Sequence, residues 1–185
     1  MKTEISIRTA DWSDRDALRD LQALSLRTLA APYYDSEAIE AFIAMGTMYE
    51  GLLDEGTFFA VAHGTTLIGC GGWSSRIPNY ARFAKGAVPE QEEANVRRIF
   101  VHPHWERRGV ARRIMEKVET DIVRAGIDQT RLLATLSGVP LYRRLGWRSG
   151  DAVTLRLPGG FKLASVDMYK RLAPAPDARL DAAAA

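Results

Sequence analysis

The residues best suited to chemistry lie in one short stretch, where three arginines flank a glycine at the start of an expected helix. Arg107, Arg108 and Gly109 precede an apolar repeat of helical spacing, and Arg112 falls in its first turn. The first N–H groups of a helix have no partners within it and carry the positive end of its dipole. Gly109 and the small Ala111 also let an anion approach the main chain closely. The stretch therefore predicts a binding site for a phosphate group.

Basic charge is concentrated around this stretch. Between Ala94 and Gly150 there are twelve Lys or Arg residues and five Asp or Glu residues, a net +7, so the remainder carries −5 of the chain's total of +2. Nearly all of the twelve are arginines, whose planar fork suits phosphate oxygens. Nucleic acid, an anionic lipid and a phosphorylated small molecule are all compatible partners. A structural turn with a solvated arginine face is the alternative, since neither a P-loop nor a G-x-G-x-x-G spacing is present.

A second segment, ATLSGVPLYRRLGW at residues 134–147, follows downstream. Together the two segments resemble the GCN5-related N-acetyltransferase (GNAT) family. In that family a Q/R-x-x-G-x-G/A loop binds the pyrophosphate of acetyl-CoA, and the tyrosine of a Y-x-x-x-G-F motif lies near the sulfur. Here the loop is residues 106–111, with Glu106 in the first position, and the tyrosine is Tyr142, with Trp147 in place of phenylalanine.

The resemblance implies acetyl-CoA as co-substrate and no metal. The strand before the loop would pair its backbone with the pantetheine arm, and Thr135 or Ser137 stands where some members place an asparagine. The residues implied to bind the cofactor are Ile99, Phe100, Val101, Arg107, Arg108, Gly109, Val110, Ala111, Arg112 and Thr135.

The implied mechanism is direct attack of a free amine on the thioester, which needs a base, an oxyanion donor and an acid for the sulfur. Tyr142 is the expected acid, with a core aromatic as its alternative role, and a backbone N–H near Phe100 or Val101 is the expected oxyanion donor. Glu93 is the expected base. The other base candidates, which are alternatively exposed loop or turn residues, are Glu90, Glu92, His102 and His104.

The acceptor is expected to be a primary amine, preferably of a small molecule, because the outer regions carry negative charge; protein N-termini and lysines stay open. The side chains expected to line its pocket, or else to pack on the sheet, are Tyr33, Tyr34, Met45, Trp73, Arg76, Tyr80 and Phe83.

These residues require an α/β domain in which strands and helices alternate. The patterning predicts the order β-α-α-β-β-β-α-β-α-β-β, a single GNAT-like domain over residues 1–172 with a mixed central sheet flanked by helices. A strand over residues 94–101 and a helix over residues 110–125 position the arginine loop. Residues 173–185 are expected to be a disordered tail.

Composition and patterning argue against several other classes of function. No signal peptide or 18-residue apolar run is visible, and Cys70 has no cysteine to pair with, so we expect a buried inert thiol in a cytoplasmic protein without membrane contact. Acidic residues along the basic helix argue against nucleic acid as partner. A non-catalytic acyl-CoA-binding or sensing module stays open as the alternative function. A homodimer is compatible with such a domain, although the sequence marks no interface.

Overall fold

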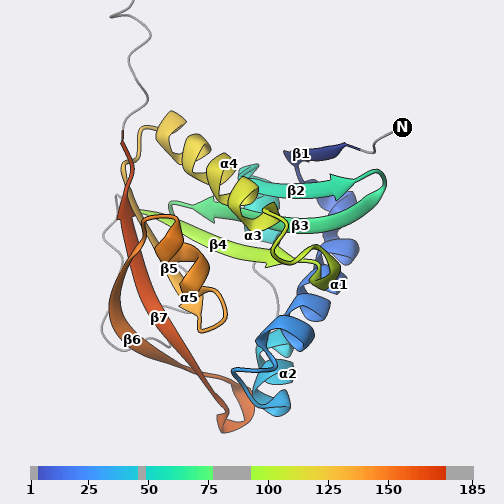
Figure 1. Ribbon diagram of the computed structural model, residues 1–185, viewed down its shortest axis with the longest axis vertical. Helices are drawn as coiled ribbons and strands as arrows, with labels where there is room; N and C mark the ends of the chain where they lie inside the picture. The colour runs from blue at the N-terminus through green and yellow to red at the C-terminus, as the bar shows by residue number, and fades with distance from the viewer. Residues whose placement is uncertain (1–3, 46–48, 77–92, 174–185) are drawn as a thin grey trace, which may run out of the picture.

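The computed structural model describes residues 4–45, 49–76 and 93–173. Its centre is a seven-stranded sheet of order β1-β2-β3-β4-β5-β7-β6, in which β4 and β5 run parallel and all other neighbours run antiparallel (Figure 1). The predicted mixed sheet is therefore confirmed. The strands are β1 Ile5–Thr9, β2 Phe58–His63, β3 Thr66–Ser74, β4 Ala94–Val101, β5 Gln129–Thr135, β6 Arg148–Arg156 and β7 Lys162–Arg171.

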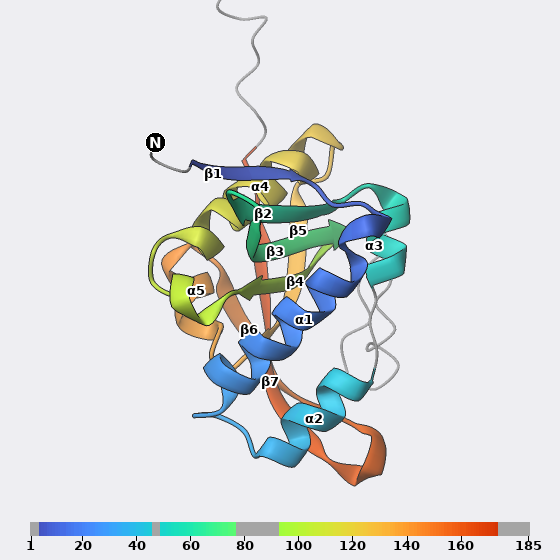
Figure 2. The same cartoon turned by 90° about the vertical axis from the view of Figure 1, so that its right-hand side faces the viewer.

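Helices cover both faces of this sheet. The helices are α1 Arg15–Ser25, α2 Ser36–Ala44, α3 Tyr49–Glu55, α4 Val110–Arg124 and α5 Val139–Arg144. Helices α4 and α5 share one core with alternate residues of the strands, whereas α1 and α3 pack on the opposite face against Phe58, Ala60 and Cys70. Figure 2 shows α1 crossing the sheet, with α2 beside the β6–β7 hairpin.

The predicted element order is confirmed with one addition, the short helix α3. Leu52 and Leu53 of α3 are buried, but its seven residues contain Gly51 and are too few to show a helical repeat. Residues 148–156 form one strand, β6, whose register against β7 shifts between Ser149 and Ala152. A bulge inside a strand interrupts the apolar alternation by which the strand would be recognised.

Helix α4 lies unusually close to the sheet because the strand beneath it is rich in glycine. A Cβ added at Gly71 would lie 2.5 Å from Ile114 of α4, and one at Gly69 would lie 2.7 Å from Val110. The buried stripe of α4, formed by Val110, Ile114, Val118 and Ile122, packs into this space. The start of α4 is thereby fixed against the end of β4.

The two parallel strands separate soon after they meet. Pairing of β4 with β5 comprises Ala94 with Thr130 and Asn95 with Arg131. Beyond this point β4 also has a register shift against β3, and Arg98 has a positive φ of 61°. One backbone edge of β4 therefore lies open from the middle of the strand onward, beside α4 and α5.

In the described residues no helix combines the length and the apolar character needed to cross a membrane.

Candidate active site

A cavity of about 410 Å³ opens between the separated strands, the start of α4, α5 and the end of α1. Nine of the ten residues predicted to bind the cofactor line it, as does Tyr142. The nine are Ile99, Phe100, Val101, Arg107, Gly109, Val110, Ala111, Arg112 and Thr135. Residues from two strands, a loop and two helices are thus brought to one site.

The loop before α4 has a conformation that aims its main chain at the cavity. Gly109 forms the N-terminal cap with φ +82°, and Arg107 also has a positive φ of 60°. No side chain caps the helix at Gly109, so the first N–H groups of α4 are available to an anion. Arg107 is exposed at the cavity wall, while Arg112 pairs with Glu116 at 2.9 Å.

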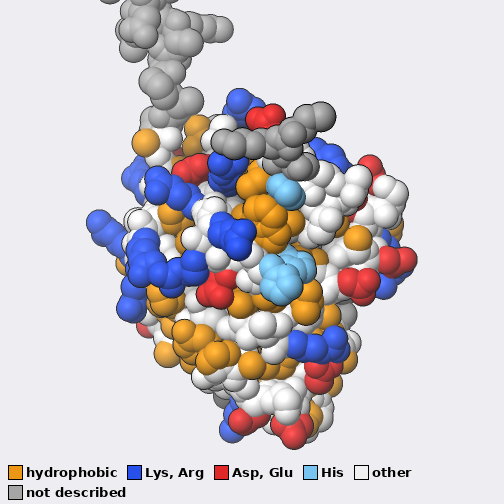
Figure 3. Space-filling view, turned by 45° about the vertical axis from the view of Figure 1, so that its right-hand side comes forward, with side chains coloured by type: hydrophobic (Ala, Val, Ile, Leu, Met, Phe, Trp, Pro, Cys, Tyr) orange, Lys and Arg blue, Asp and Glu red, His pale blue; other side chains and the backbone are white. Residues whose placement is uncertain are grey.

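Arg108, the tenth predicted residue, points elsewhere. Its guanidinium lies over the Trp105 ring at 5.4 Å from the ring centre, and Trp105 in turn meets His63 at 4.7 Å between ring centres. Figure 3 shows histidine side chains beside hydrophobic ones on one face of the molecule, with Lys and Arg side chains gathered next to them. Trp105 itself lines the cavity.

Tyr142 is buried at the cavity wall. Burial raises the pKa of its phenol far above the ordinary value of 10, because ionisation would place a charge in an apolar environment. A Cβ at Gly138 would lie 2.9 Å from the Tyr142 ring, so the turn before α5 leaves just enough room for the ring. The other side of the ring meets Trp147 edge-on at 6.2 Å. The phenol is therefore held fixed and protonated.

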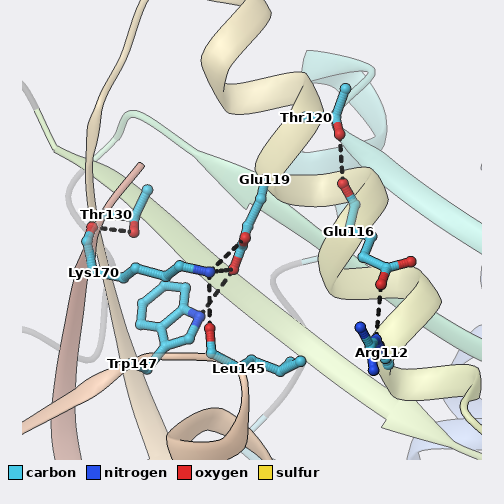
Figure 4. A network of polar contacts seen from close by, with 8 residues as sticks. All are labelled: Arg112, Glu116, Glu119, Thr120, Thr130, Leu145, Trp147 and Lys170. Atoms are coloured by element: carbon cyan, nitrogen blue, oxygen red, sulfur yellow. Dashed lines mark hydrogen bonds and ion pairs between the residues drawn. The ribbon is translucent and has the colours of Figure 1, made fainter. Parts of the chain in front are cut away.

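A polar network anchors the helix that carries Tyr142 (Figure 4). Lys170 of β7 donates to both carboxylate oxygens of Glu119 in α4, at 2.9 and 2.7 Å, and to the carbonyl of Leu145 at 2.9 Å. The indole N–H of Trp147 donates to the same carboxylate at 3.0 Å. Both charged groups are largely shielded from water, which strengthens their attraction. The network ties α5 to α4 and to the sheet.

The wall opposite the loop is apolar. It is formed by the end of α1 and the π-helical turn that continues it, Leu26–Ala30. Leu26, Leu29, Ala30 and Tyr33 line the cavity there, together with the hydroxyl-bearing Ser25. This wall supplies shape and apolar surface without charge.

Comparison with known proteins identifies the fold. The model of the acetyltransferase (GNAT) domain matches residues 54–149, just over half of the chain. The chain belongs to the GNAT family. It is an acetyl-CoA-dependent N-acetyltransferase by that membership, as its two motifs predicted. No curated protein sequence matches the chain.

Solved structures of GNAT proteins share the fold at low sequence identity. PaiA N-acetyltransferase from Thermoplasma acidophilum, solved with coenzyme A, is 19% identical with a TM-score of 0.67, covering 91% of this chain and 99% of its own. A GCN5-related N-acetyltransferase from Rhodopseudomonas palustris is 15% identical with a TM-score of 0.72, covering 93% and 98%. YncA from Salmonella typhimurium, solved with acetyl-CoA, is 18% identical with a TM-score of 0.62, covering 94% and 98%.

The cavity of this GNAT domain suits the chemistry of coenzyme A. Anionic phosphates match the N–H groups at the start of α4 and the arginines beside them. The open backbone edge of β4 offers hydrogen-bonding groups to the amides of a pantetheine arm. The apolar wall and Tyr142 lie where the strands have separated.

Glu93, the predicted base, does not line this cavity. Its carboxylate is bonded to Arg131 at 3.4 Å, and Arg131 also holds Asp167 through two hydrogen bonds of 2.9 and 3.1 Å. Glu93 therefore belongs to a charged cluster at the start of β4, where β4 and β5 are paired. Glu90 and Glu92 lie outside the described residues. His102 accepts a hydrogen bond from the backbone N–H of His104 at 3.2 Å, within the turn after β4.

The residues expected at the acceptor pocket are dispersed. Tyr33 lines both the cavity and a second hollow of about 540 Å³ next to the β6–β7 hairpin. The hydroxyl of Tyr34 donates to the carbonyl of Ala164 at 2.7 Å and accepts from the N–H of Leu136 at 2.6 Å, so it joins α2's entry to two strands. Met45 packs against the hairpin core.

Two further expected acceptor residues have structural roles. Trp73 is buried in the core and donates to Asp121 at 2.9 Å, so its ring is not free to line a pocket. Arg76 pairs with Glu55 at 3.3 Å. Tyr80 and Phe83 lie outside the described residues. Among the described residues expected at an acceptor pocket, only Tyr33 lines the cavity.

Cys70 is buried, as predicted, on the α1 side of the sheet. Burial raises the pKa of its thiol to about 12. A thiol with that pKa stays protonated at neutral pH and is a poor nucleophile.

Sequence reasoning missed several cavity residues of the GNAT domain. They are Ser25, Leu26, Leu29, Ala30, Trp105, Gly138, Pro140, Leu141 and Arg144, together with Glu106, which was noted only as a departure from the motif. Those near Tyr142 had a signal, since they share its short motif. The cavity residues of α1 had no such signal. Apolar spacing predicts that a side chain is buried, but it does not predict which residues cover it.

Proposed function

We propose that this domain transfers the acetyl group of acetyl-CoA directly to a primary amine of a small molecule. The observation that carries the proposal is the cavity in which nine predicted cofactor residues and Tyr142 meet. In this reading the coenzyme's diphosphate binds at the start of α4, its pantetheine arm follows the open edge of β4, and residues 1–172 form the catalytic unit.

Tyr142 is the proposed acid. In direct transfer the amine nitrogen forms a bond to the acetyl carbon, the carbon–sulfur bond breaks, and a proton must reach the leaving sulfur. A phenol whose pKa is raised by burial keeps its proton throughout the neutral range, and the anchored helix fixes its direction. A backbone N–H near Phe100 or Val101, on the open edge of β4, is the proposed donor to the oxyanion.

Glu93 is the proposed base. It is a carboxylate beside the paired end of the parallel strands, and its bond to Arg131 orients it. Because Glu93 does not line the cavity, a proton from the amine would reach it through water rather than by direct contact. When Glu93 takes up the proton, Arg131 would remain paired with Asp167, so the charge of the arginine stays compensated.

Calorimetric titration with acetyl-CoA, desulfo-coenzyme A and adenosine tests the cofactor site. The expected result is saturable binding of the first two at micromolar affinity and no binding of adenosine alone, after which primary amines are screened by thiol release. A folded protein that binds neither form of the coenzyme would show that the loop before α4 is only a structural turn.

Replacement of Tyr142 by phenylalanine separates an enzyme from a binding module. We expect kcat to fall by about 100-fold, a typical contribution of a positioned acid, while the Kd of coenzyme A stays unchanged. Because the phenol pKa is raised, the wild-type kcat should show no loss from Tyr142 ionisation up to about pH 10. Tyr169→Phe, at an exposed position of β7, is the control. Equal turnover of both variants and the wild type would remove Tyr142 from the mechanism.

A further inference from the structure

Helix α1 contains a buried polar side chain whose hydrogen-bonding capacity is not used. Gln22 is only 3% exposed, and its side-chain oxygen Oε1 has no hydrogen-bond partner in the described part of the chain. A buried acceptor without a donor costs folding free energy, because it has lost its hydrogen bonds to water. Groups of this kind are expected at functional sites, where stability gives way to another requirement.

The helical repeat places Gln22 next to the cavity. Ser25 and Leu26 follow it by three and four residues, a spacing at which side chains adjoin on one helix face, and both of them line the cavity. The π-helical turn Leu26–Ala30 begins directly after Ser25, and such turns are frequent at functional sites. Gln22 and Ser25 thus form the polar end of an otherwise apolar wall, and we call them the α1 polar pair.

Phe100 relates the α1 polar pair to the reaction. Its side chain packs against one cluster that contains Leu18 and Leu21 and against a second that contains Leu26. Gln22 lies between these two groups along α1 and is therefore close to Phe100. Because a backbone N–H near Phe100 is the proposed donor to the oxyanion, the α1 polar pair lies on the side of the cavity where the acetyl carbon is expected.

The attacking amine needs hydrogen-bond acceptors on the side that faces away from the thioester. A neutral primary amine has one lone pair and two N–H groups. When the lone pair forms the bond to the acetyl carbon, both N–H groups point elsewhere, and against a purely apolar wall they would stay unpaired. We propose that Oε1 of Gln22 and the hydroxyl of Ser25 each accept one N–H of the acceptor and so orient its lone pair. This inference rests on the proposed function.

Two acceptors for two N–H groups make the α1 polar pair a determinant of specificity. A secondary amine has a single N–H and leaves one of the two acceptors unpaired. A site built to hydrogen-bond its substrate discriminates against an analogue that lacks the bonding group, because the buried polar group of the protein then stays unsatisfied. The site therefore prefers a primary amine to its N-methyl derivative.

The first test is Gln22→Met in the full chain, which keeps the length of the side chain and removes its carbonyl. With n-butylamine and saturating acetyl-CoA we expect the KM of the amine to rise about tenfold, the value of one hydrogen bond, and the Kd of coenzyme A to stay within about twofold. The urea midpoint should rise, because the unpaired acceptor is gone. Gln129→Met, at the exposed first residue of β5, is the control and should change none of these values. An unchanged KM, or a lowered urea midpoint, would overturn the inference.

The second test uses N-methyl-n-butylamine beside n-butylamine. The ratio of kcat/KM for the primary amine over the secondary amine should fall about tenfold in Gln22→Met, and it should also fall in Ser25→Ala. A change of packing alone would not move this ratio, so an unaltered ratio in both variants would overturn the role of the α1 polar pair. Absence of thiol release by the wild type would instead contradict the proposed transfer to a small amine, so the two failures are distinguishable.

Discussion

The two walls of the cavity differ in charge and in how they are built. The loop wall comes from one continuous stretch before and into α4 and is basic, whereas the α1 wall comes from residues 25–33 and is apolar. A basic wall favours an anionic ligand, and an apolar wall favours a ligand whose shape fits it. In the proposed function, the basic wall binds the cofactor through charge and the apolar α1 wall accommodates the acceptor through its shape.

Binding of coenzyme A should weaken when the backbone conformation of the loop wall is changed. Gly109→Ala adds a Cβ in open space, but at φ +82°, where alanine is strained. We expect the loop to relax and misdirect the N–H groups of α4, which raises the Kd of coenzyme A about tenfold, equivalent to about 1.4 kcal/mol.

Gly126→Ala is the matched control, since Gly126 follows the other end of α4 with the same φ of +82° and open space around its Cα. Each variant should lower the free energy of unfolding by about 1 kcal/mol. Only Gly109→Ala should weaken coenzyme binding. An equal Kd in both variants would mean that the loop's conformation does not matter to the cofactor.

A substitution in the α1 wall should change the KM of the amine rather than the Kd of the coenzyme. Leu29→Gln puts a polar amide on the apolar wall, and we expect the KM of the amine found by the screen to rise about fivefold, the value of a partly buried apolar contact. The Kd of coenzyme A should not change. Leu24→Gln, at an exposed position outside the cavity, is the control. A change in coenzyme affinity with an unchanged amine KM would reverse the assignment of the two walls.

The free energy of unfolding should also depend on pH through a carboxyl group next to α1. Asp14 precedes α1, and hydrogen bonds from Arg8 hold the pKa of its carboxyl below the ordinary 3.8. Such a group stabilises the folded state above its unfolded pKa, and this contribution is lost as the pH falls through the lowered value. Asp14→Asn should cost about 1 kcal/mol of unfolding free energy at pH 7.

Urea unfolding at pH 7 and near pH 2 measures this dependence. The difference between wild type and Asp14→Asn should shrink in acid, as the wild-type carboxyl takes up a proton. Asp16→Asn, at an exposed position of α1, should stay within about 0.5 kcal/mol of wild type at both values. A difference that persists in acid would place the role of Asp14 in packing rather than in charge.

The same contrast explains what the sequence could predict. Arg107, Gly109 and Ala111 act through a helix start that they themselves encode, so residue type and spacing were sufficient. Tyr142 was recognisable because residues 142–147 resemble the Y-x-x-x-G-F motif of the family. The strands β2 to β5 followed from apolar patterning of the ordinary kind.

The α1 wall could not be predicted in this way. Leu26 and Ala30 lie in a π-helical turn, whose spacing differs from that of the helix before it, and the sheet places them opposite a loop about eighty residues later in the chain. Glu93 was chosen for its position before β4, but its partner Arg131, and the Asp167 that this arginine also binds, come from two other strands. Register across a sheet decides such contacts, and one sequence does not show it.

The position of β7 has a consequence for how the protein is made. This strand is the last described element, yet it lies inside the sheet between β5 and β6, and it supplies the Lys170 that anchors α5. While the ribosome is still translating the segment before β7, the nascent chain already contains the arginine loop and Tyr142 without that anchor. The anchor of α5 can therefore form only once Lys170 has left the exit tunnel.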